Sequence, residues 1–329
     1  MNPSTVESRP PSSVAVSGRP SAPPPHAPEL GRASRLLGRF HVTGVFWFRL
    51  HRVGISILPE WGVWLFTVLF TTFFFVALRR IRKAISANLD AALGSCGWWR
   101  RQERIYRTMW NFAWCLSERY ERLSTERRVT PIPALGEEHW QRALADPEGL
   151  ILITAHVGHW EVGSMMVPER HVNVVREEEM DPRAQKFVLE LFEQQAASSF
   201  TMHFARDDPA LGLQLLKALR RGEYVAVQGD RPRTSGRTCN VELFGRRLAL
   251  PAGPAALARA ANVALMPVFV FRRGRHRSQV VFRPPVRVEH KGEAGIAEAM
   301  GRIAAEIEWA ILHQPHQWFC FRQLWGERR

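Results

Sequence analysis

A short apolar stretch, Leu150 to Thr154, constrains the fold more than any other part of the sequence. It reads LILIT, and such a run is typical of a strand buried on both faces of a sheet. Candidate strands lie at residues 150–155, 172–176, 200–204, 224–229, 239–244, 265–272 and 279–288, and candidate helices at 183–198, 208–221, 253–262 and 295–312. Because strands alternate with helices, we predict an α/β fold with a mixed, mainly parallel sheet flanked by helices.

His156 follows the first of these strands, and Glu161 comes five residues later. In a single helix the two side chains would point about 140° apart, because each residue turns about 100°. They can meet if the strand ends at His156, the chain turns at Gly158, and Glu161 lies in the first turn of a helix. The carboxylate would then hold one ring nitrogen, and the other nitrogen would serve as a general base for a hydroxyl.

Two other interpretations of this histidine stay open. A lone histidine beside an apolar strand is often structural, and His156, His159 and Glu161 are all possible metal ligands. A zinc site needs three or four ligands in a compatible geometry, and the sequence has no partner His/Cys pair elsewhere. We therefore expect no metal.

Two more candidate strands end in polar residues. Arg176 follows the letters NVV, and Asp230 follows YVAVQG. Ligands of mainly parallel sheets bind beyond the carboxyl ends of the strands, so we expect a base, a cation and a carboxylate at one edge of the sheet. Residues 244–247 indicate a hairpin-like turn with two cations, and residues 251–258 indicate a loop that enters a helix.

The N-terminal part has a different composition. We expect residues 1–40 to be a disordered tail rich in proline and serine, because it can bury too little apolar surface to order itself. Residues 41–83 include an uncharged run from Trp61 to Leu78, which as a helix would extend about 27 Å, at the short end of a bilayer span. We predict an N-terminal membrane-anchoring helix that spans the bilayer or lies in its plane. A buried core helix is the alternative.

Charge supports a membrane partner. The chain carries 45 Lys and Arg against 31 acids, for a net charge of +14, which indicates an anionic partner. Twelve Trp and 19 Phe against three Tyr suit a membrane-associated protein better than one that binds nucleic acid. The basic residues that directly follow the anchor place the downstream domain in the cytoplasm by the positive-inside rule. The four cysteines have no paired spacing, which fits a reducing compartment.

Two further segments follow the anchor. Residues 84–135 form a basic helical segment that we expect to contact anionic headgroups, although a solvated helix face is the usual explanation of such a run. Residues 136–329 form the α/β core.

Taken together, these motifs resemble the bacterial lipid A biosynthesis acyltransferase family, the late lauroyl and myristoyl transferases, within the lysophospholipid acyltransferase group. The resemblance is carried by His156 and Glu161, by Gly229-Asp230-Arg231, by VELFG at 241–245, by PAGP at 251–254, by PHQW at 315–318, and by Arg82 and Asn88-Leu89 after the anchor. It covers residues 45 to 325, nearly everything except the tail.

The resemblance implies a glycerolipid-acyltransferase-like αβα sandwich. It also implies transfer of a fatty acyl chain from a thioester, on acyl carrier protein or coenzyme A, to a hydroxyl of a lipid A-type precursor or other glycolipid. His156 would be the base and Glu161 would orient it, without a covalent acyl-enzyme. Phosphate or sugar groups of the lipid would be bound by Arg176, Asp230, Arg231, Gly245 and Arg246.

The resemblance implies no cofactor beyond the thioester co-substrate, and no nucleic acid partner. The expected partners are acyl carrier protein or acyl-coenzyme A, an anionic lipid acceptor and membrane phospholipids. The expected location is the bacterial inner membrane, with the catalytic domain on its cytoplasmic face. Alternatives are acylation of a lysophospholipid, hydrolysis of a thioester or lipid with the same histidine, and lipid binding without catalysis.

Overall fold

The computed structural model describes residues 53–54, 57–124, 130–160, 170–177, 200–205, 209–232 and 236–326. The strands are β1 (Thr130–Leu135), β2 (Leu150–Thr154), β3 (Val172–Arg176), β4 (Phe200–Phe204), β5 (Tyr224–Gln228), β6 (Thr238–Leu243), β7 (Arg246–Pro251), β8 (Ala264–Gly274) and β9 (Arg277–Phe282). The helices are α3 (Glu60–Ala77), α4 (Arg79–Leu93), α5 (Trp98–Ser124), α6 (Glu137–Ala145), α8 (Pro209–Arg220), α9 (Gly253–Ala261), α10 (Gly292–His313) and the 3₁₀ helix η3 (Pro315–Gln317). The tail expected at 1–40 and the helix expected at 183–198 lie outside the described residues.

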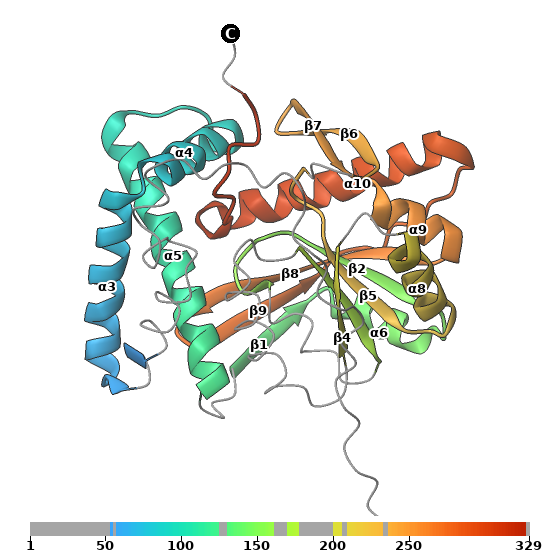
Figure 1. Cartoon of the computed structure of the whole chain (residues 1–329), viewed down its shortest axis with the longest axis horizontal. Coiled ribbons are helices and arrows are strands. Elements are labelled where there is room, and N and C mark those ends of the chain that lie inside the picture. The colour runs from blue at the N-terminus through green and yellow to red at the C-terminus, as the bar shows by residue number, and fades with distance from the viewer. Residues whose placement is uncertain are drawn as a thin grey trace, which may run out of the picture.

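The central element is a seven-stranded sheet with the order β1-β9-β8-β2-β5-β3-β4 (Figure 1). Strands β8, β2, β5, β3 and β4 run parallel to their neighbours in this order. Strand β9 runs antiparallel to β8, and β1 runs parallel to β9, so these two strands oppose the other five. The predicted mixed, mainly parallel sheet is confirmed.

Strand β2 is buried on both faces, as its composition predicted. Ile151 and Ile153 pack into a core formed with α8, α9, α10 and the β6-β7 hairpin. Leu150 and Leu152 point to the opposite face and pack with Trp140 of α6. Alternate residues of one strand therefore hold helices on the two sides of the sheet.

Strand β1 contains two prolines and was not predicted. Proline has no backbone N–H, so it is rare in a central strand, which pairs with a neighbour on each side. Strand β1 lies at the edge of the sheet, beside β9, where Pro131 and Pro133 are tolerated. The sheet therefore begins at Thr130, within the segment 84–135 that the sequence indicated as helical. The strand expected at 279–288 ends earlier, at Phe282.

Strands β6 and β7 form a separate antiparallel hairpin, as residues 244–247 indicated. Phe244 and Gly245 make the turn with φ angles of 55° and 65°. Two successive positive φ angles match the twist of a hairpin, and glycine adopts them readily. Phe244 adopts this less favourable conformation while its N–H donates a 2.6 Å hydrogen bond to Glu308 Oε2 of α10.

Helices α3, α4 and α5 form an N-terminal layer beside the sheet. Helices α3 and α5 run side by side at one end of the molecule, and α8 and α9 lie at the other end (Figure 1). Within the described residues, α3 is the one helix long and apolar enough to cross a membrane, by length and composition alone. Its residues Val63, Thr67, Thr71 and Phe74 are buried, whereas Trp61 and Leu69 are exposed.

Candidate active site

The site lies where β2 and β5 end, next to each other in the sheet. These strands pair in register, with Thr154 opposite Gln228, so the chain emerges from both at the same edge. Two residues beyond these positions stand His156 and Asp230. His156 Nδ1 lies 2.7 Å from Asp230 Oδ1.

The carboxylate fixes the proton arrangement of the imidazole. Asp230 is fully buried, and an ionised carboxylate can only accept hydrogen bonds, so His156 donates its Nδ1–H to Asp230. Nε2 is then the nitrogen that can accept a proton. The His156 side chain is 13% exposed, which leaves it accessible to a ligand at the strand ends.

Asp230 stays ionised despite its burial. Burial alone would raise its pKa, but the contact with His156, the positive charge of Arg231 and the hydrogen bond from Trp318 hold the pKa of Asp230 well below its usual range. Trp318 Nε1 donates to Asp230 Oδ2 at 3.1 Å. Both carboxylate oxygens are therefore engaged.

Backbone contacts hold the loop after His156 in place. The Phe319 N–H donates to the His156 carbonyl at 2.9 Å, and the Gly158 N–H donates to the Gln317 carbonyl at 3.0 Å. Gly158 has a φ of 55°, and a Cβ at this position would lie 2.3 Å from the Val270 carbonyl oxygen. Only glycine fits here, where residue 158 forms a bridge with Val270.

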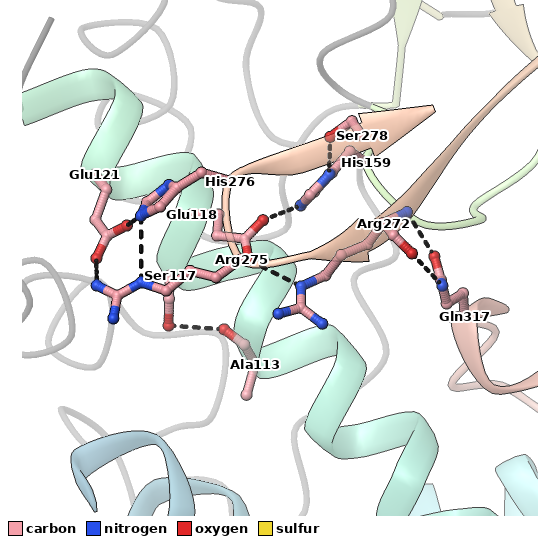
Figure 2. A network of polar contacts seen from close by, with 10 residues as sticks. All are labelled: Ala113, Ser117, Glu118, Glu121, His159, Arg272, Arg275, His276, Ser278 and Gln317. Atoms are coloured by element: carbon pink, nitrogen blue, oxygen red, sulfur yellow. Dashed lines mark hydrogen bonds and ion pairs between the residues drawn. The ribbon is translucent and has the colours of Figure 1, made fainter. Parts of the chain in front are cut away.

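His159 belongs to a second polar network, which joins the same loop to α5. Figure 2 shows its ring between Ser278 of β9 and Glu118 of α5. Nδ1 lies 2.7 Å from Ser278 Oγ, and Nε2 lies 2.9 Å from Glu118 Oε2. Because both ring nitrogens are engaged and the side chain is buried, His159 is not placed to take a proton from a ligand.

Glu118 also binds Arg272 of β8, whose Nε donates to Glu118 Oε1 at 2.8 Å. Burial alone would raise the pKa of Glu118, but the contact with His159 and the charge of Arg272 hold that pKa below its ordinary value. One turn further along α5, Glu121 accepts a 3.2 Å hydrogen bond from Arg275 (Figure 2). The segment predicted to be basic therefore presents two buried acids to the β8-β9 hairpin.

The other predicted binding residues lie at several places. Arg176 ends β3, beside β5, so it lies at the same edge of the sheet as His156. Arg231 donates to the Phe319 carbonyl at 2.7 Å. Gly245 forms the tip of the β6-β7 hairpin, and the Arg246 guanidinium lies 5.9 Å from the centre of the Trp325 ring.

Glu161 lies outside the described residues, so its predicted contact with His156 stays a prediction. From the sequence, Asp230 is expected to bind the substrate. In the structure, its carboxylate accepts the hydrogen bond from His156 Nδ1. Their separation of 74 residues hid this pairing. The signal that could have found it is their shared position, two residues beyond strands that pair in register.

Comparisons with known proteins agree on the class of protein. Residues 39–327 match the family described as bacterial lipid A biosynthesis acyltransferase. The chain is also 26% identical, over 194 residues, to phosphatidylinositol mannoside acyltransferase from two Mycobacterium tuberculosis strains, CDC 1551 / Oshkosh and ATCC 25618 / H37Rv. Each match covers 58% of this chain and spans 58% of the length of the relative.

Replacing Glu118 with alanine is expected to cost about 3–5 kcal/mol of the free energy of unfolding at pH 7, because Arg272 and His159 lose a buried partner. The matched control is Glu103→Ala on the same helix, where an exposed pair with Arg107 contributes about 0.5 kcal/mol or less. Urea unfolding measures both.

The effect should also depend on pH. Because the pKa of Glu118 is lowered by folding, its stabilisation is present above the unfolded pKa of about 4.3 and is lost as the pH falls through the folded pKa. The difference between the wild type and Glu118→Ala should therefore shrink below about pH 4.3. Equal losses in the Glu118 and Glu103 variants at pH 7 would contradict the buried pairing.

Proposed function

From the premise that the chain belongs to the bacterial lipid A biosynthesis acyltransferase family, we propose that it is a membrane-attached O-acyltransferase that moves a fatty acyl chain from a thioester to a hydroxyl of a lipid. The observation that carries this proposal is the 2.7 Å contact between His156 Nδ1 and Asp230 Oδ1 at the carboxyl edge of the sheet. An imidazole held in this way has the arrangement of a general base.

The proposed reaction is a direct transfer. His156 Nε2 takes the proton of the acceptor hydroxyl as its oxygen attacks the thioester carbonyl carbon. The tetrahedral intermediate then collapses with cleavage of the C–S bond, and the imidazolium returns the proton to the departing thiolate. Asp230 stabilises the imidazolium and holds the ring in one orientation throughout.

The substrates are inferred by class. The donor is an acyl thioester of acyl carrier protein or coenzyme A, and the acceptor is a lipid A-type precursor or other glycolipid. The mycobacterial relatives, named as acyltransferases of a phosphatidylinositol mannoside, support a glycolipid that carries phosphate. Arg176, Arg231 and Arg246 are proposed to contact its anionic or sugar groups. A lysophospholipid is the alternative acceptor.

We propose that the protein attaches to the cytoplasmic face of the bacterial inner membrane through α3. One face of this helix is buried in the N-terminal layer, so its outer face is the part available to lipid. The exposed apolar residues of α3 and of the start of α5 are Trp61, Trp64, Leu65, Leu69, Phe73, Val76, Trp98 and Trp99. Exposed Arg79, Arg80 and Lys83 follow at the start of α4, where they suit anionic headgroups.

The activity is tested with purified full-length protein, acyl-coenzyme A or acyl carrier protein thioesters, and candidate lipids, with products identified by mass spectrometry. His156→Asn and Asp230→Asn are each expected to lower acyl transfer by about 10²–10⁴-fold, because proton transfer or ring orientation is lost. His290→Asn is the control, since that histidine is exposed and pairs with Glu298. Glu161→Gln, measured in parallel, tests whether that carboxylate also contributes.

The same assay separates the alternatives. A hydrolase would release free fatty acid whether or not an acceptor lipid is present, and a lipid-binding protein would do neither reaction. Full transfer activity in His156→Asn would contradict the mechanism. Mass spectrometry of the lipids that lose an acyl chain in a deletion strain would identify the acceptor.

Direct transfer requires that no cysteine carries the acyl chain. Cys320 is the thiol to check, because it lies close to Asp230 in the site. Burial raises the pKa of Cys320 to about 11, so only about one thiol in 10⁴ is ionised at pH 7. Cys320→Ser should retain most activity, and iodoacetamide should label the half-buried Cys239 before Cys320. An acyl adduct on Cys320 in mass spectra would contradict direct transfer.

Membrane attachment is tested by flotation with vesicles of phosphatidylethanolamine and phosphatidylglycerol. Leu69→Glu should weaken vesicle binding about tenfold or more, because an exposed apolar contact of α3 is replaced by a charge that repels anionic lipid. Leu213→Glu is the matched control, since this leucine is also more than half exposed but lies on α8 at the other end of the molecule (Figure 1). Equal effects of the two variants would contradict attachment through α3.

A further inference from the structure

The PHQW segment at 315–318 contacts β8, the loop after His156, and Asp230. Gln317 holds β8, because its side chain accepts from the Arg272 N–H at 2.9 Å and donates to the Arg272 carbonyl at 2.8 Å. Its own carbonyl accepts from the Gly158 N–H. The segment is thus fixed between β8 and the loop that follows His156.

Trp318 carries the contact closest to the chemistry. Its side chain is 2% exposed, and its indole N–H is directed at Asp230 Oδ2. The other carboxylate oxygen of Asp230 accepts from His156. An indole nitrogen can only donate, so this contact is compatible with an ionised Asp230 and with one carboxylate orientation.

We infer that Trp318 is a positioning residue, which fixes the carboxylate of Asp230 so that His156 keeps its proton on Nδ1 and presents Nε2 to the acceptor hydroxyl. A carboxylate held at one oxygen alone can rotate about its terminal torsion, which is a broad and soft one. The indole N–H holds the second oxygen. This role rests on the proposed function, because it concerns the same base.

The position of Trp318 is itself fixed from several sides. Residues 157 and 318 form an antiparallel bridge, so the tryptophan backbone is joined to the loop after His156. The indole packs against Phe244 at the tip of the β6-β7 hairpin, with ring centres 6.0 Å apart. Asn88 of α4 donates hydrogen bonds to the carbonyls of Cys320 and Arg322, which fixes the chain that follows.

The test is Trp318→Phe, which retains an aromatic ring and removes the N–H. We expect kcat to fall about tenfold, which is the rate equivalent of losing one hydrogen bond to a charged group. KM should change by less than about twofold. Trp140→Phe is the matched control. This tryptophan is also buried and packs on an aromatic ring, that of Phe282, but it lies on the other face of the sheet, and the kcat of the variant should stay at the wild-type value.

A second readout does not need acyl transfer. In protein labelled with ¹⁵N-histidine, the His156 signals are assigned by their loss in His156→Asn, and their shifts report which nitrogen carries the proton. The wild type and Trp140→Phe should show the Nδ1–H tautomer, and Trp318→Phe should show a mixture of tautomers.

The two hypotheses fail in different ways. If the wild type transfers no acyl group from any thioester, the proposed function fails, while a tautomer change in Trp318→Phe would still support the positioning role. If Trp318→Phe folds and keeps both the wild-type kcat and the Nδ1–H tautomer, the positioning role is wrong and the proposed function stands. A fall in kcat that merely follows a smaller folded fraction, measured by circular dichroism, would also overturn it.

Discussion

The site depends on the in-register pairing of β2 with β5. This pairing brings the chain out of two neighbouring strands at one edge, and it places His156 and Asp230, which are 74 residues apart in sequence, within hydrogen-bonding distance. A shift of one residue would turn every side chain of β2 to the other face of the sheet. Ile151 and Ile153 pack on one face of β2, and Leu150 and Leu152 pack on the other. A shift would exchange side chains of different shape in two close-packed cores, so core packing and the contact between His156 and Asp230 depend on the same register.

Much of this arrangement could be predicted from the sequence because it follows local patterns. The apolar runs located β2, β3, β4 and β5, and the strand-end principle placed His156, Arg176 and Asp230 at one edge. Strand β1 was missed because its two prolines are uncommon in strands, although they suit an edge. Strand β7 was missed because its first two residues have the pattern of a turn and its last residue, Pro251, that of a loop.

The partners within the site could not be predicted, because they depend on contacts between distant segments. Asp230 was expected to bind substrate, and nothing in its own sequence neighbourhood reveals that Trp318 and His156 occupy both of its oxygens. Glu118 lies in a stretch dominated by arginine, where an acid is easily taken for a solvent-exposed residue. Its burial results from the packing of α5 against the β8-β9 hairpin, where it pairs with Arg272 (Figure 2).

The long sequence separations at the site have a consequence for how the protein matures. The contact between Asp230 and Trp318 joins residues 88 positions apart, and Asn88 contacts the carbonyl of a residue 232 positions away. Such contacts close long loops, and the entropic cost of closing a loop grows with its length. Trp318 is synthesised 88 residues after Asp230, so a chain growing on the ribosome cannot complete the hydrogen bonds of this carboxylate until the tryptophan has emerged.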